Sequence, residues 1–136
     1  MALPAIGGGY QANDGNLNEP VIGKMAAPNT ATVTATLTTT QLLGGILLGS
    51  PGTSAAAYTT PTGTDIDTAL GNAKIGSTFD LDIINVDGSS SGVITLTAGT
   101  GITIVGLATV VATAGTAQVF RFRKTGTGTY TCYRYG

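Results

Sequence analysis

Short stretches of alternating polar and apolar residues, interrupted by glycine turns about every eight to twelve positions, dominate this sequence. Residues 30–38 alternate strictly, with threonine at every second position and Ala, Val, Ala and Leu between. A period of two is typical of a strand with one buried face. The apolar runs 46–48 and 102–105 are also of strand length and too short for a helix. The pattern predicts a mainly β fold: a single β-sandwich or barrel-like domain with one short helix.

The helix is expected just after Pro61. Thr64 is the predicted N-cap, and Asp65 and Asp67 follow in the first turn, where the helix dipole favours negative charge. Gly76 is expected to end this helix. Before it, a single turn is expected at 41–43, capped by one of the three preceding threonines and stopped by two glycines.

From Thr78 onward the pattern predicts only strands. Residues 78–85 and 93–97 are expected to form a hairpin, and residues 117–124 are expected to pair with 129–135. If Gly126 and Thr127 centre the second turn, the aromatic side chains face the core and the cations face outward. The predicted core face then carries Phe120, Phe122, Tyr133 and Tyr135, and the outer face carries Arg121, Arg123, Tyr130 and Arg134.

Residues 1–29 differ from the β domain, which is predicted to span residues 30–136. They contain three prolines and a Gly-Gly-Gly run, and they show no periodic apolar pattern. Such a segment cannot bury enough surface to order itself, so an extended N-terminal arm is expected. The alternatives are a solvated tail and an arm that a partner orders. The apolar residues that would anchor it to a partner are Leu3, Ile6, Tyr10, Leu17, Val21 and Ile22.

The composition argues against most catalytic chemistry. Charged residues make up 10 % of the chain, and histidine is absent, which excludes a Ser-His-Asp triad, a Cys-His pair and an imidazole zinc site. The net charge of −1 gives no electrostatic footprint for nucleic acid. Two long windows lack charge, but Thr, Gly, Ser and Pro interrupt both, so no membrane-spanning helix is expected. We therefore expect neither an enzyme nor a cofactor or metal site.

The remaining reactive residues have structural interpretations. Cys132 lies in an alternating segment with no histidine to act as a base, so a buried or half-buried thiol is expected. The aspartates are of the residue type that calcium prefers, but their spacing matches no EF-hand loop. A hydrolase based on two aspartates stays open by residue type alone.

Two charged strands offer candidate ion pairs. Asp80 and Asp82 share one face of the strand that begins near Thr78, and Arg121 and Arg123 share one face of a strand near the C-terminus. If these strands are neighbours in a sheet or across a subunit boundary, a cross-strand ladder of Arg–Asp pairs is expected. A nucleic-acid patch is the rival interpretation of the cations.

Several segments resemble a virion module of tailed bacteriophages. The resemblance covers about residues 30–136 and is carried by the pattern of segments 36–38, 41–49, 61–65, 76–85, 93–101 and 121–134. These segments are similar to capsid decoration (cement) proteins and to fibre-like head or tail components. The resemblance implies a homotrimeric, non-enzymatic β protein on the outer capsid surface, with the major capsid protein as its partner.

Low charge and abundant threonine also suit a protein that buries much of its surface in permanent contacts. The expected function is therefore structural: a decoration protein that binds the outside of a phage capsid and stabilises contacts between its subunits. The alternative is a fibre or adhesin module that binds a host glycan.

Overall fold

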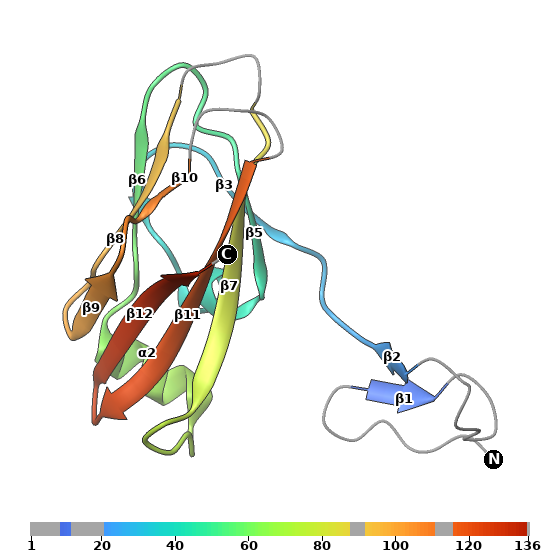
Figure 1. Cartoon of the computed structure of the whole chain (residues 1–136), viewed down its shortest axis with the longest axis vertical. Helices are drawn as coiled ribbons and strands as arrows, with labels where there is room; N and C mark the ends of the chain where they lie inside the picture. The colour runs from blue at the N-terminus through green and yellow to red at the C-terminus, as the bar shows by residue number, and fades with distance from the viewer. Residues whose placement is uncertain (1–8, 12–20, 88–91, 111–115, 136) are drawn as a thin grey trace.

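The computed structural model describes residues 9–11, 21–87, 92–110 and 116–135. Two sheets pack against each other around one core, which confirms the mainly β, sandwich-like fold (Figure 1). The larger sheet has six strands in the spatial order β3 (Asn29–Ala31), β5 (Ile46–Gly49), β7 (Thr78–Asn85), β11 (Thr116–Gly126), β12 (Thr129–Tyr135) and β9 (Ile102–Val105). The smaller sheet has four, in the order β10 (Thr109–Val110), β8 (Ile94–Thr97), β6 (Ala56–Thr59) and β4 (Ala35–Thr36).

Consecutive strands from β3 to β11 lie in alternate sheets, so the chain winds around the core. As far as β8, each turn places a strand parallel to the one two positions earlier, as in the pairs β5–β7 and β6–β8. Further along the chain, β10 pairs antiparallel with β8. The antiparallel hairpin β11–β12 then fits between β7 and β9 and completes the larger sheet. The hairpin predicted from residues 78–85 and 93–97 is therefore wrong, because β7 and β8 belong to different sheets.

The same winding divides the alternating segment 30–38. Its start joins the larger sheet as β3, and residues 35–36 join the smaller sheet as β4. Tyr58 fixes the crossing between them, because its hydroxyl donates to the carbonyls of Ala31 (3.1 Å) and Thr32 (2.9 Å). Val33, which an unbroken strand would bury, is 70 % exposed.

Two helices close one end of the sandwich. The first, α1 (Thr39–Leu43), begins with a capping box between Thr38 and Gln41, so the single predicted turn is a short helix. The second, α2 (Gly63–Leu70), is capped by Thr62 and not by the predicted Thr64. It also ends earlier than predicted, at Gly71, whose φ of +64° is costly for other residues.

The last hairpin pairs as predicted, but its faces differ from the prediction. The turn centres on Thr127 and Gly128, and a bulge at Thr125 shifts the register, so that Gly126 lies opposite Thr129. This shift of one residue moves Tyr130 and Cys132 into the core and leaves Tyr133 and Tyr135 exposed.

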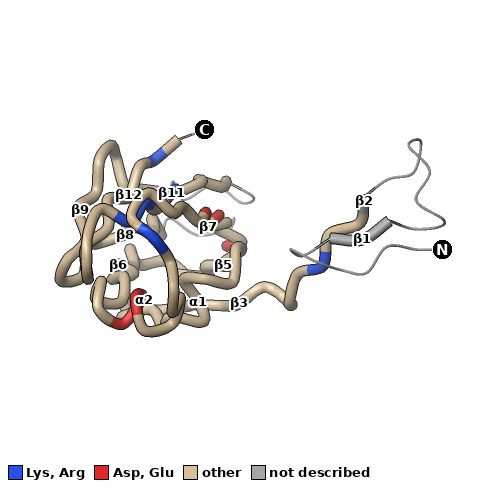
Figure 2. Tube along the Cα trace, turned by 90° about the horizontal axis from the view of Figure 1, so that it is seen from below, with Lys and Arg blue, Asp and Glu red and all other residues tan. Residues whose placement is uncertain are grey.

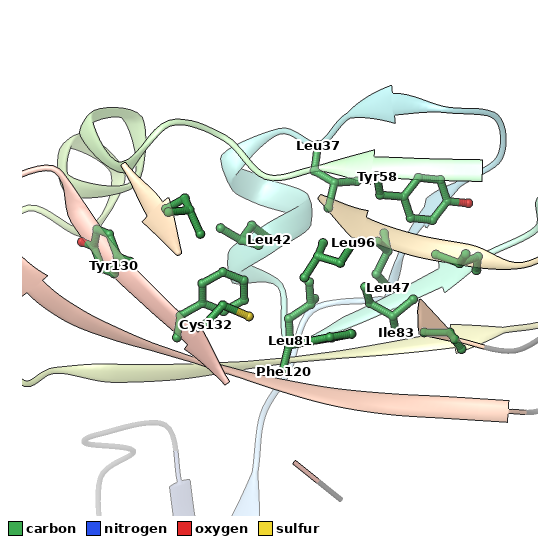
Figure 3. Close-up of a cluster of buried hydrophobic side chains, with 14 of the residues drawn as sticks. Leu37, Leu42, Leu47, Tyr58, Leu81, Ile83, Leu96, Phe120, Tyr130 and Cys132 are labelled. Atoms are coloured by element: carbon green, nitrogen blue, oxygen red, sulfur yellow. The ribbon is translucent and has the colours of Figure 1, made fainter. Parts of the chain in front are cut away.

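The core lies between the two sheets (Figure 3). Its largest buried side chains include Tyr58 from the smaller sheet and Phe120, Phe122 and Tyr130 from the larger one. Phe79 stacks on Phe122 with ring centroids 4.9 Å apart. Cys132 is fully buried, as predicted. Burial raises the pKa of its thiol to about 12, so the reactive thiolate is suppressed at neutral pH.

Candidate functional site

Cations concentrate on the β11–β12 hairpin and carboxylates on β7 and α2 (Figure 2). The register of β7 and β11 places Arg121 directly opposite Asp80 on the outer face of the larger sheet. The Nε and Nη2 atoms of Arg121 donate to the two carboxylate oxygens of Asp80 at 2.8 and 2.9 Å. The Tyr135 hydroxyl donates to Asp80 Oδ2 (2.9 Å), and Arg121 lies over the Tyr135 ring, 4.6 Å from its centroid. Together these contacts hold the three side chains in one arrangement.

The charges of this group reinforce each other. The hydrogen bond from Arg121 is the main cause of the lowered pKa of Asp80, and the carboxylate in turn raises the pKa of Arg121. Both side chains remain almost half exposed, so solvent screens the pair. We conclude that the group sets the local shape of this face more than it stabilises the fold.

The other two candidates for the ladder do not pair. Asp82 lies opposite Val119 and Ile46, and its Oδ1 atom is buried without a hydrogen-bond partner. Burial therefore raises the pKa of Asp82. Arg123 is exposed opposite Thr78, and the described residues offer it no ion-pair partner. Among the described residues, this face thus carries one Arg–Asp pair where a ladder was predicted.

Apolar side chains flank the paired charges. Tyr133 and Tyr135 on β12, Val105 on the edge strand β9 and the following Leu107, which is 65 % exposed, are open to solvent. Because β12 and β9 are neighbours and Tyr133 lies opposite Val105, the two tyrosines and Val105 share one face of the larger sheet. Leu107 follows just beyond the end of β9. We call this group the β9–β12 surface.

The structure describes three of the six residues predicted to anchor the arm. Leu3, Ile6 and Leu17 lie outside the described residues. Tyr10 belongs to β1 (Gly9–Gln11) and Val21 and Ile22 to β2 (Val21–Gly23), two short strands that pair with each other. This pair lies away from the two large sheets (Figure 1).

Residues 22–28, which run from within β2 to the start of the edge strand β3, are exposed throughout. They include Ile22 and Met25, whose side chains are 38 % and 54 % exposed.

A cluster around Asp67 was not anticipated from the sequence. Asp67 lies on α2, and its carboxylate accepts hydrogen bonds from the Lys124 ammonium, from the Tyr130 hydroxyl (2.5 Å) and from the Gly128 amide (2.7 Å). These bonds, that from Lys124 first, lower the pKa of Asp67 from 3.8 to about 2. Burial and the contact with Asp67 raise the pKa of Tyr130. Lys124 shares the inner face with Phe120 and Phe122 by alternation along β11. Only the shifted register brings Tyr130 to that face, so the sequence pattern alone does not reveal the cluster.

Threonines line an open cleft of about 650 Å³ beside the N-terminus of α2. Its walls include Thr36, Thr60, Thr62 and Thr100, and Asp65 is the charged residue among the described residues that line it. Hydroxyl groups and one carboxylate suit hydrogen bonding to a polyol. No aromatic ring belongs to the described lining.

Three comparisons with known proteins give no relative: no family model matches the chain, and neither a characterised protein nor a solved structure is significantly similar. Within the described ranges, no group of three or more His, Cys, Asp or Glu side chains is arranged to hold a metal ion. The described helices are all too short or too polar to cross a membrane.

Proposed function

We propose that this chain is a structural virion protein, a decoration protein that binds the outside of a tailed-phage capsid and stabilises contacts between its subunits. The observation that carries the proposal is the exposed segment 22–28, which leads from the sandwich to the separate β1–β2 pair. Exposed Ile22 and Met25 gain stability when a partner covers them. A folded domain with such an extension suits attachment to a large neighbouring surface.

The proposal includes self-association as a homotrimer. The two sheets end in four edge strands, β3, β9, β4 and β10. Unpaired edges invite further pairing, and a closed oligomer removes them. The β9–β12 surface adds exposed tyrosines and aliphatic residues beside one of these edges, a composition typical of interface cores.

Capsid binding by two forms of the protein tests this function. A variant lacking residues 1–27 keeps β3, whose Asn29 side chain donates to the Thr40 carbonyl at 3.2 Å. The truncated and full chains are mixed with preformed capsids and sedimented together. We expect the full chain to sediment with the capsids and the truncated chain to bind at least tenfold more weakly. Equal binding by both forms contradicts the role of the arm, and no binding by either contradicts the function.

The threonine-lined cleft supports a second candidate, a fibre or adhesin module that binds a host glycan. Binding of the full chain to host cells, but not to capsids, favours this candidate. Loss of that binding in Asp65→Ala would locate it in the cleft, because Asp65 carries the charge among the described lining residues.

A further inference from the structure

Lys124 and Asp67 are brought together from two elements that are far apart in the sequence. Lys124 points inward from β11, and only 10 % of its side chain is exposed. Its ammonium contacts Oδ1 of Asp67 on α2, whose side chain is 19 % exposed. The Tyr130 ring covers the Lys124 nitrogen at 5.5 Å, and Phe79 lies edge-on to that ring. An amine and a carboxyl group are thus enclosed in contact, largely away from bulk water.

Two further donors act on the same carboxyl group. The backbone N–H of Gly128 donates to Oδ2 at 2.7 Å, and the Tyr130 hydroxyl donates to Oδ1 at 2.5 Å. A fixed N–H on one oxygen stabilises negative charge that develops there when a nucleophile attacks the carbon. A hydroxyl on the other oxygen supplies a path for protons to a leaving group.

We propose that Lys124 and Asp67 condense into an amide, an intramolecular isopeptide bond that joins β11 to α2. The Lys124 Nζ forms a bond to Asp67 Cγ, and the bond from Cγ to Oδ1 breaks. Oδ2 remains as the amide oxygen, held by the Gly128 N–H. The ammonium begins with three protons and the amide keeps one. The other two leave with Oδ1 as water, and Tyr130 returns to its starting state. The reaction requires no oxidant, metal or other reactant.

Proximity makes this condensation favourable in the folded chain. Well-oriented groups react with effective molarities of about 10⁵–10⁸ M, which offsets the tendency of an amide to hydrolyse in water.

The ion pair must first become neutral by proton transfer from Lys124 to the carboxylate. Because the pKa of Asp67 is about 2, the neutral pair is rare. The reaction is accordingly a slow, single maturation step after folding.

Close backbone packing fixes the Gly128 donor. A Cβ atom on either Gly63 or Gly101 would clash with the Gly128 carbonyl oxygen, so the turn sits directly on the start of α2 and on the loop before β9. This packing holds the N–H of Gly128 on Asp67 with little freedom to move. The cluster therefore has the preorganised donors that acyl chemistry requires.

The intact mass of the purified full chain tests the proposal. We expect a mass lower than that of the sequence by one water, about 18 Da. Acylated Lys124 resists trypsin, so a branched peptide joining residues 25–74 to residues 124–134 is also expected. An intact mass equal to that of the sequence, unchanged after long incubation of the folded protein, overturns the proposal.

Variants distinguish this bond from other losses of water, such as succinimide formation at Asp14-Gly15 or Asp87-Gly88. Lys124→Arg should restore the full mass, and the matched control Lys74→Arg, at a lysine outside the cluster, should not. Asp67→Asn should lose ammonia, about 17 Da, in place of water. Tyr130→Phe should slow the loss at least tenfold. A water loss that persists in Lys124→Arg contradicts the proposal even if that variant folds poorly.

Discussion

Two aspartates on the outer face of β7 lie in opposite environments although they are two residues apart. Asp80 accepts two hydrogen bonds from Arg121, so its pKa is lowered. Asp82 has a buried oxygen without a partner, so its pKa is raised. The charged form of the first is therefore stabilised by folding, and that of the second is destabilised.

The same substitution should consequently have opposite effects at the two sites. At pH 7, Asp82→Thr should raise the free energy of unfolding by up to about 1 kcal/mol, because it removes a carboxylate that has one buried oxygen without a partner, and because threonine suits a strand. Asp80→Thr should lower it, because Arg121 loses its partner. Urea unfolding of both variants measures the difference, and a change of the same sign at both sites would refute this account.

The pKa shifts of Asp80 and Asp82 also determine how the stability of the fold changes with pH. The contribution of Asp80 is present above its unfolded pKa, about 4, and is lost as pH falls through its lower folded value. The cost of Asp82 is present at neutral pH and disappears as pH falls through its raised pKa toward about 4. The advantage of Asp82→Thr over the unmodified chain should thus shrink between pH 7 and pH 4, as unfolding at several pH values would show.

The buried thiol of Cys132 can be tested by chemical labelling. Since burial raises its pKa to about 12, the folded chain should resist alkylation by iodoacetamide at pH 8. Labelling should become complete in denaturant. Rapid labelling without denaturant would mean that β12 opens readily, and this outcome would contradict its position between β11 and β9.

At the scale of elements, contact between backbones decides which glycines are essential. Gly63 at the start of α2 packs on the Gly128 carbonyl. A Cβ at Gly44 would clash with the end of the Asn29 side chain, which can move, and would lie 3.1 Å from the Thr40 carbonyl oxygen, a tight contact but not a clash. Alanine can adopt the backbone conformation at both positions, because neither Gly63 nor Gly44 has a positive φ.

Gly63→Ala should therefore destabilise the fold by about 1–3 kcal/mol or more, since two backbones must separate. Gly44→Ala is the matched control and should cost clearly less. Thermal unfolding of the two variants gives the comparison. If both variants lose the same stability, α2 is not closely packed on the β11–β12 turn.

Local patterns at this scale were predictable, and long-range pairings were not. Threonine and glycine near 38–44 indicated a capped turn, and the alternation in 117–124 and 129–135 indicated a hairpin. The bulge at Thr125 has no clear signal in composition, yet it decides which face of β12 is buried. The candidate Asp80–Arg121 pair depended on strand neighbours that periodicity alone does not specify, because a period of two fixes faces but not partners.

For the whole molecule, the exposed edges and the β9–β12 surface predict association. Sedimentation equilibrium at micromolar concentration should give three times the mass of the 13.5 kDa chain. Replacement of the exposed Leu107 by Asp should shift the equilibrium toward monomer, whereas Ile75→Asp, at an equally exposed residue away from this surface, should not. A monomer for the unmodified chain would refute the trimer.

The position of the last hairpin governs the order in which the sandwich can be built during synthesis. In the larger sheet, β9 pairs with β12 alone, and one long side of β7 is open until β11 arrives. A nascent chain that lacks β11 and β12 has its larger sheet divided into β3–β5–β7 and an unpaired β9. It contains Tyr58 but lacks Phe120, Phe122 and Tyr130, the other large aromatic side chains of the described core. Folding of the sandwich must therefore wait until β11 and β12 have been synthesised, and a chain truncated just before them should be an aggregation-prone polypeptide in place of a slightly shortened domain.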